Sequence, residues 1–135
     1  MRTINKIIIH CSATPADFRF TAADITRWHQ ARGFKTLGYP YVILIDGRIE
    51  KGRPEWQTGA HCQGHNDDSI GVCYIGGLDA LSLQPRDTRS ATQKATMRRL
   101  ISQLLARYPD ATVYGHRDFA RRDCPCFDAK EEYRR

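Results

Sequence analysis

Two histidines and one cysteine stand at positions where they could bind a metal ion together. His10 ends an apolar, β-branched run, His116 ends a second apolar segment, and Cys124 follows in the stretch YGHRDFARRDCPCF, residues 114–127. Imidazole and thiolate both suit Zn²⁺, and three protein ligands leave the fourth tetrahedral position for water. Such an open site is catalytic in type, because bound zinc makes water acidic enough to supply hydroxide near neutral pH.

The same residues also have a purely structural interpretation. His10 would then be a hydrogen-bonded core histidine, His116 a turn residue and Cys124 a small buried hydrophobic residue. The sequence contains no Cys-x-x-Cys or His-Glu-x-x-His signature that would favour a metal site. Cys126 competes with Cys124, because Pro125 favours an extended chain in which alternate side chains point the same way. The residues alone leave the choice between the two cysteines open.

The metal ligands need strands whose ends meet. Residues 4–10 and 70–77 are apolar enough for buried strands, and residues 111–116 predict a short third one. Residues 39–53 predict a hairpin that turns at Asp46-Gly47. Two histidines at strand ends can meet if their strands are neighbours in the sheet.

Helices are predicted between these strands. Thr21 is a suitable N-cap with Asp24 in a capping-box position, and Gly33 fits the end of that helix. Residues 92–109 predict an amphipathic helix, and a short charged helix is expected within residues 121–135. The apolar stripe of the amphipathic helix is Met97, Leu100, Ile101, Leu104 and Leu105. The alternation predicts an α/β fold, with a central mixed β-sheet flanked by helices on its faces, in a single domain covering residues 1–135.

The composition is that of an ordinary globular protein with a basic excess. Hydrophobic residues make up 41% of the 135 residues, and the formal net charge is +6. That charge suits an anionic partner such as nucleic acid or a cell-wall polymer. Nucleic acid is not favoured, because the basic residues are spread along the chain without an aromatic-basic repeat. The start of the sequence lacks a signal-peptide core and no stretch has transmembrane length, so we expect cytoplasmic synthesis without a signal peptide and no membrane insertion.

Further polar residues could take part in chemistry near the expected site. Tyr39 could orient water or stabilise an oxyanion, or could simply pack half-buried. His61 and Asn66 lie in a long polar loop, residues 53–69, where side chains can face a substrate, whereas a solvated position is expected for His65. Trp56, in the same loop, is either a sugar or peptide platform or a loop anchor.

The other cysteines are expected to be structural. Five cysteines cannot form a fully paired disulfide framework. Cys11 faces away from His10 if both lie in one strand, so core packing is its predicted role. Cys73 lies in an apolar strand and is also expected in the core.

Four segments together resemble the zinc-dependent N-acetylmuramoyl-L-alanine amidases, a family that includes small phage amidase-lysozymes and animal peptidoglycan recognition proteins. The segments are IIIHCSAT, LGYPYVILIDGRIEKGR, GAHCQGHNDDSIGVCYIGG and GHRDFARRDCPCFD, and they run from about Ile7 to Asp128. The resemblance implies an α/β domain with a mixed sheet, a zinc ion and a groove for peptidoglycan. It also implies hydrolysis of the amide between the lactyl group of N-acetylmuramic acid and the L-alanine of the stem peptide.

The resemblance also implies residue roles. Its zinc ligands fall on His10, His116 and Cys124, which favours Cys124 over Cys126. Its active-site tyrosine falls on Tyr39, and the substrate-lining residues of its loop fall on His61 and Asn66.

One position departs from the family. Two residues before the ligand cysteine, phage amidases carry a lysine and many recognition proteins a threonine, whereas this chain has Arg122. An arginine can hold substrate or stabilise an oxyanion, but it cannot shuttle a proton. Tyr39 and Arg122 are therefore the expected catalytic residues, with a water-borne proton relay.

Alternative functions remain within the same resemblance. Some members bind peptidoglycan without cutting it, and those typically lack the cysteine ligand that Cys124 supplies here. Cytosolic relatives cleave anhydro-muropeptides during wall recycling, which the missing signal peptide suits as well as it suits a phage-type lysin released by a membrane pore. A phage amidase of this shape can also bind an RNA polymerase, but nothing in this sequence marks such a surface. We expect a monomer whose partner is peptidoglycan or muropeptides.

Overall fold

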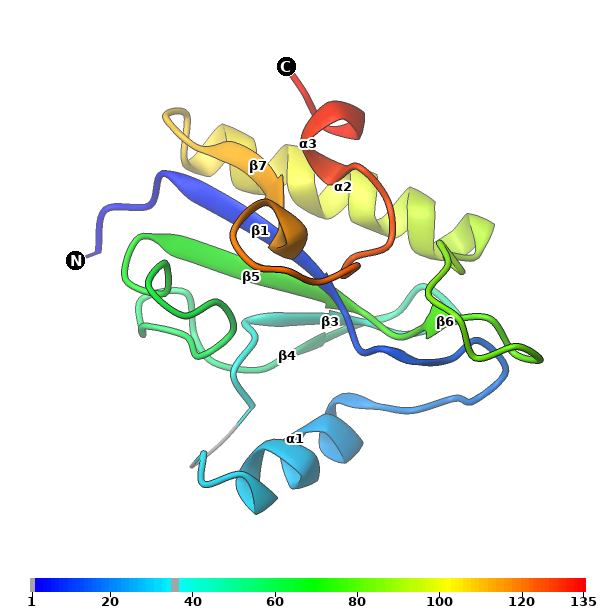
Figure 1. Ribbon diagram of the computed structural model, residues 1–135. Helices are drawn as coiled ribbons and strands as arrows, with labels where there is room; N and C mark the ends of the chain where they lie inside the picture. Colours follow the sequence, from blue (N-terminus) through cyan, green and yellow to red (C-terminus); the bar gives the residue numbers. More distant parts are fainter. Residues whose placement is uncertain (1, 35–36) are drawn as a thin grey trace.

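A five-stranded mixed sheet forms the centre of the computed structural model, which describes residues 2–34 and 37–135 (Figure 1). The strand order is β4-β3-β5-β1-β7. The strands are β1 (Lys6–Cys11), β3 (Tyr41–Ile43), β4 (Ile49–Lys51), β5 (Ser69–Tyr74) and β7 (Thr112–Gly115). β1 pairs in parallel with β5 and β7, β3 pairs in parallel with β5, and β4 runs antiparallel to β3. The predicted mixed α/β sheet is confirmed.

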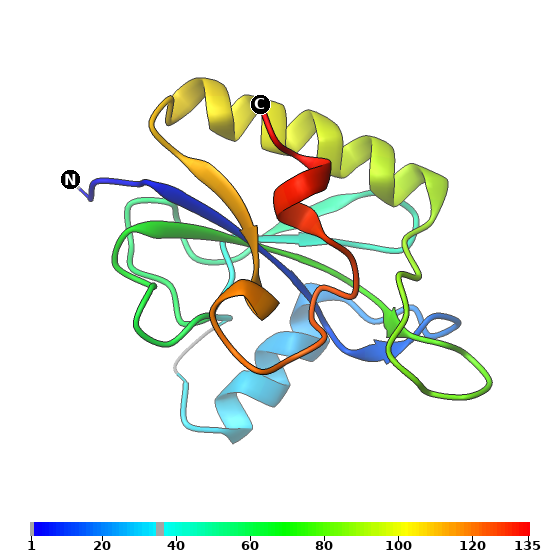
Figure 2. The same cartoon turned by 45° about the horizontal axis from the view of Figure 1, so that its top comes forward.

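Helices cover both faces of this sheet. Helices α2 (Ala91–Arg107) and α3 (Ala129–Glu132) lie on one side, and α1 (Ala22–Ala31) lies on the other (Figures 1 and 2). The buried side chains accordingly form two clusters. The α2 side contains Ile7, Ile9 and Met97, and the α1 side contains Ile25 and Cys73. The sheet therefore separates two apolar layers, as expected of parallel strands covered on both faces.

The alternation of side chains along β1 decides where His10 points. Ile7, Ile9 and Cys11 all belong to the cluster under α2. His10 has the opposite parity, so it points to the α1 side, where Cys73 is its register partner in β5. The prediction that Cys11 packs into the core and faces away from His10 is confirmed, as is the core position of Cys73.

The predicted N-cap of the first helix is confirmed, and the second predicted helix begins at Ala91 with a cap that was not predicted. Thr21 and Asp24 form a reciprocal capping box at the start of α1, and Ser90 and Gln93 form another at the start of α2. The predicted apolar stripe of α2 is buried, with Leu105 only partly so. These caps fix where each helix leaves the loop before it.

Two local features differ from the sequence prediction. The hairpin turns through three residues rather than at a two-residue turn, because Leu44 N–H bonds the Arg48 carbonyl and Gly47 has a φ of 89°. A second sheet was not predicted, in which β2 (Thr14–Pro15) pairs with β6 (Gly77–Leu78). Strands of two residues carry no alternation that a sequence could reveal. Three residues of the expected 1–135 domain, at positions 1, 35 and 36, lie outside the described residues.

None of the helices in the described part of the chain has the length and apolar character needed to cross a membrane.

Candidate metal centre and substrate cleft

Neighbouring strands bring the two predicted histidine ligands together. Ile9 of β1 is paired with Gly115 of β7, so the next residues, His10 and His116, leave the sheet side by side. Their ring centroids are 4.6 Å apart. His116 is the first residue of a 3₁₀ turn, His116–Asp118, rather than the last residue of the strand. The strand-end argument from the sequence is therefore sound, because the two strands are adjacent.

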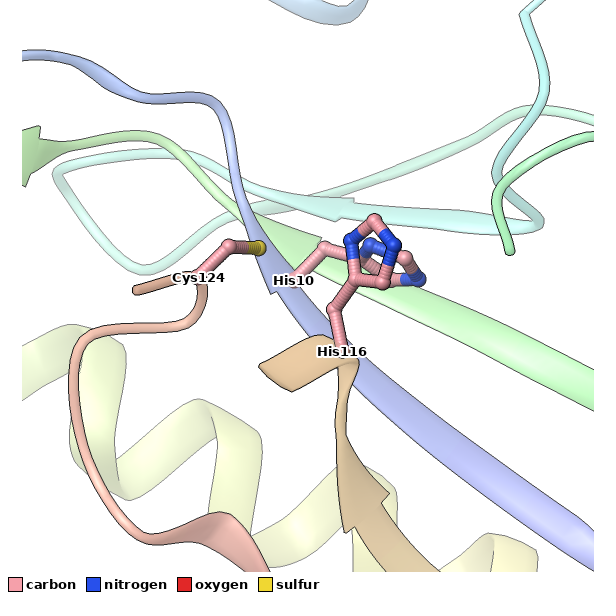
Figure 3. A group of neighbouring side chains, drawn as sticks. All are labelled: His10, His116 and Cys124. Atoms are coloured by element: carbon pink, nitrogen blue, oxygen red, sulfur yellow. The ribbon is translucent and has the colours of Figure 1, made fainter. Parts of the chain in front are cut away.

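Cys124 returns to the same place through the loop after this turn. Its sulfur accepts a hydrogen bond from Cys11 N–H at 3.1 Å, and its carbonyl accepts one from Arg117 N–H at 2.8 Å. The ligand atoms of His10, His116 and Cys124 all lie within 4.8 Å of one another (Figure 3). Two imidazoles and a thiolate at such distances could hold a metal ion, and their donor types fit zinc.

The protonation state of the two histidines suits the binding of a cation. His10 is 1% exposed, and burial lowers its pKa well below the ordinary value, with smaller contributions from His61, His116 and Arg122. Burial, followed by the charge of Arg122, also lowers the pKa of His116. Both rings are therefore neutral near pH 7, as a metal-binding imidazole must be.

Tyr39 lies beside the ligands. Its ring centroid is 5.0 Å from that of His10 and 5.5 Å from that of His29. Burial raises the pKa of its phenol well above the ordinary value, and the thiol of Cys73 adds to this. Tyr39 therefore keeps its hydroxyl proton and can serve as a hydrogen-bond donor at neutral pH.

A cleft of about 600 Å³ opens beside these groups. Tyr39, His116 and Arg122 line it on one side, and the loop residues His61 and Asn66 also contribute to its wall. The Arg122 side chain is exposed and also borders a smaller adjoining cavity of about 260 Å³ next to α1. Of the residues that the sequence proposed for the site, five line this cleft and Cys124 lines the adjoining cavity, the five being Tyr39, His61, Asn66, His116 and Arg122.

His61 and Asn66 are more deeply built into the loop than an exposed substrate contact would be. His61 is 9% exposed, and its Nδ1 lies 2.8 Å from His10 Nε2. Burial lowers the pKa of His61 to about 3. The side-chain oxygen of Asn66 accepts from the N–H groups of His61 and Cys62, both at 2.9 Å. A substrate contact for either residue remains a prediction.

The expectation that Cys126 points with Cys124 in an extended run is wrong. Cys126 has a φ of 72°, which is left-handed rather than extended backbone. Its sulfur turns to the Gly77 carbonyl at 3.3 Å and lies 3.9 Å from Cys11 Sγ. Among the described residues, the converging ligand group contains Cys124 and not Cys126.

The structure also bears on what was expected of two other loop residues, His65 and Trp56. His65 is not simply solvated, because its ring lies against Phe119 with centroids 4.0 Å apart. Trp56 is 72% exposed and borders a separate hollow of about 550 Å³ that contains Arg2 and Tyr108. Its exposure does not fit the role of a loop anchor.

Sequence reasoning missed two residues that support the site. His29 of α1 is buried, accepts from Gly38 N–H at 3.0 Å and thereby helps place Tyr39. The helical spacing of His29 from Ile25 indicates that its side chain faces inward, but it does not indicate which residue that side chain contacts. Ser69, the first residue of β5, contacts His61 through its hydroxyl at 3.2 Å. No sequence signal connects Ser69 to the metal ligands.

Comparison with known proteins identifies the family. Residues 1–127 match the family model described as N-acetylmuramoyl-L-alanine amidase. The endolysin of Escherichia phage T7 is 37% identical over 126 residues, which cover 93% of this chain and 83% of the phage protein. The human N-acetylmuramoyl-L-alanine amidase is 32% identical over 127 residues, covering 88% of this chain and 22% of the human protein. Among solved structures, N-acetylmuramoyl-L-alanine amidase LysC from Clostridium intestinale URNW has a TM-score of 0.81 and 26% identity, covering 97% of this chain and 82% of that chain.

The family match spans the whole sheet and every element that positions the site. It includes β1 with His10, the turn with His116 and the loop with Cys124. The chain therefore belongs to the N-acetylmuramoyl-L-alanine amidase family.

Proposed function

We propose that this amidase is zinc-dependent and that His10, His116 and Cys124 hold the ion. The observation that carries the proposal is the convergence of these three ligand atoms within 4.8 Å, beside a cleft that His116 lines. The donor set leaves one tetrahedral position open, as in catalytic zinc sites. Zinc, when bound, would supply Lewis acidity that polarises a carbonyl group and activates water.

The residues around the ligands suit hydrolysis of an amide. Tyr39 keeps its proton, so it can donate a hydrogen bond to an oxyanion that develops on the scissile carbonyl. Arg122 adds a permanent positive charge at the same cleft. Neither group readily accepts the proton that the attacking water releases near neutral pH, so neither can relay it to the departing amine. Solvent or a nearby group takes up that proton and protonates the amine. Asn66 and His61 belong to the wall against which the substrate would lie.

The substrate that we propose is the amide between N-acetylmuramic acid and L-alanine in peptidoglycan. The family match and the similarity to phage endolysins support this choice. Action on the intact wall after release from the cell is the endolysin-like form of the proposal. Cleavage of soluble anhydro-muropeptides is the alternative, and the products of one assay can separate the two.

Paired cysteine variants test the metal site. In Cys124→Ser we expect zinc content to fall from about one ion per chain to near zero, and activity with it, because a serine hydroxyl is a poor zinc ligand. Cys126→Ser is the matched control, since it makes the same replacement of sulfur by oxygen two residues away. This variant should keep both zinc and activity. Zinc is measured by elemental analysis, and products from sacculi and from anhydro-muropeptide by mass spectrometry.

Three results would contradict the proposal. Lysis that persists after complete removal of zinc would exclude a metal-dependent mechanism. Loss of zinc in Cys126→Ser but not in Cys124→Ser would assign the other cysteine as ligand. Zinc binding without release of stem peptide from either substrate would make the protein a binding module.

A further inference from the structure

A buried series of hydrogen bonds links His10 to His61, Ser69 and the backbone of His65. His10 Nε2 lies 2.8 Å from His61 Nδ1, and His61 Nε2 lies 3.2 Å from Ser69 Oγ. Ser69 Oγ lies 2.6 Å from the backbone oxygen of His65. His10 and Ser69 are each 1% exposed and His61 is 9% exposed. These polar atoms therefore depend on one another rather than on bulk water.

The hydrogen bond between Ser69 and the His65 carbonyl determines which atom donates in every other hydrogen bond of this series. The His65 carbonyl can only accept, so it takes the single hydroxyl proton of Ser69. The Ser69 oxygen then has only lone pairs to offer, which requires a proton on His61 Nε2. In a neutral imidazole the other nitrogen is an acceptor, so His61 Nδ1 receives the proton of His10 Nε2.

We infer that His61 and Ser69 are positioning residues that hold His10 with its proton on Nε2 and its Nδ1 lone pair directed to the metal. A metal-binding histidine generally gives its other N–H to a second group, which fixes its tautomer and ring orientation. In this chain the second group is another histidine, which a serine orients in turn. The inference rests on the proposed metal site, but the tautomers are properties of the metal-free protein.

Two glycines make room for the His61 ring in this position. A Cβ built on Gly71, in the interior of β5, would lie 2.8 Å from the ring, and one built on Gly59 would lie 2.9 Å from its Cδ2. Glycine inside a strand often marks such a close approach. Both backbones thus pack directly against the ring, which confines it beside His10. This packing is independent of the hydrogen bonds and points to the same fixed orientation.

Nuclear magnetic resonance of the metal-free protein tests the inference directly. Long-range ¹H–¹⁵N correlation spectra distinguish the two neutral tautomers of each histidine ring. We expect both His10 and His61 to carry the proton on Nε2. In Ser69→Ala we expect mixed tautomers for both rings, and a zinc affinity, measured by competition with a chelator, that is lower by about 10-fold or more.

Thr96→Val is the matched control for the loss of a buried hydroxyl. Thr96 is 4% exposed and donates to the Gly47 carbonyl at 2.7 Å, on the other side of the sheet from His10. This variant should lose similar stability but keep the tautomers and the zinc affinity. A proton on His10 Nδ1 in the wild-type protein would overturn the inference, whether or not Ser69→Ala folds. Unchanged zinc affinity in Ser69→Ala, or an equal loss in Thr96→Val, would also overturn it. Correct tautomers in a protein whose activity needs no zinc would instead contradict the proposed function alone.

Discussion

Arg122 brings a permanent positive charge to the cleft. Its side chain is exposed, and it borders both the main cleft and the smaller cavity beside α1. Its charge contributes to the lowered pKa of His10 and of His116, although burial is the larger cause for each. The field of this guanidinium therefore reaches the proposed metal ligands. A cation placed there would favour negative charge that develops in a transition state.

We predict that Arg122→Ala lowers kcat by about 10- to 100-fold while zinc content stays unchanged. The loss of one donor in a fully enclosed oxyanion hole costs about 100- to 1,000-fold, and an exposed arginine should contribute less. Arg122→Lys should keep much of the rate, because it retains the charge. Turnover is measured on a soluble muropeptide with the metal-loaded enzyme.

Arg121→Ala provides the comparison for this prediction. Arg121 is the neighbouring exposed arginine, and it does not line the cleft among the described residues. Its removal lowers the net charge equally but leaves the site unchanged. Equal rates for the wild type and Arg122→Ala would remove Arg122 from the chemistry, and equal losses in the two alanine variants would indicate only a general charge effect.

At the scale of elements, one buried arginine ties the C-terminal helix to the rest of the fold. The Arg89 side chain is 1% exposed and forms paired hydrogen bonds with Asp87 and with Glu132 at 2.7 to 3.0 Å. It also donates to Tyr133 Oη at 3.0 Å, and its guanidinium carbon lies 3.4 Å from the ring centroid of Phe127. α3 and the segment after Cys126 are thereby held against the start of α2.

We predict that Arg89→Met lowers the free energy of unfolding by about 2–3 kcal/mol, because it leaves two carboxylates without their partner. The figure is below that of a fully buried ion pair, since Glu132 is 42% exposed. Arg86→Met, which breaks an exposed pair with Asp79, should lower the free energy of unfolding much less, because water solvates both partners of that pair. Urea unfolding measures both. An equal decrease in the free energy of unfolding for the two variants would show that the burial of Arg89 does not strengthen its ion pairs.

The elements explain how much could be predicted from the sequence. The apolar run that ends in His10 and the segment that ends in His116 were sufficient to place two proposed ligands at strand ends, because the order of residues along a strand fixes where each side chain lies. That these strands are neighbours depends on sheet order, which no local pattern encodes. The Cys126 prediction failed because a loop does not follow the alternation of a strand. The hydrogen bond from Ser69 to His61 depends on how a long loop folds back, and local sequence does not determine that.

At the scale of the whole molecule, the site makes stability depend on pH because it buries several neutral histidines. Burial is the largest cause of the lowered pKa of His10, His29, His61 and His116. An unfolded chain has ordinary histidines, which titrate at a pKa of about 6.5. As the pH falls through this value, the histidines of the unfolded state bind protons, whereas the buried histidines of the folded state do not. The contribution of these rings to stability is therefore complete above about pH 6.5 and is lost progressively below it.

We predict that the metal-free protein loses at least about 2 kcal/mol of stability between pH 7 and pH 5, which is the contribution of His61 alone. The folded pKa of His61 is about 3, so its ring stays neutral in the folded state across this range. Burial lowers the pKa of His10 as well, which adds to the loss. His29 and His116 act in the same direction. Urea unfolding at pH 7, 6 and 5 measures the loss, and His61→Gln should make it smaller by about 2 kcal/mol, since one titrating group is gone. A flat profile would mean that the buried rings accept protons without unfolding, and the hydrogen-bonded arrangement around His10 would then not be the one that the folded protein keeps.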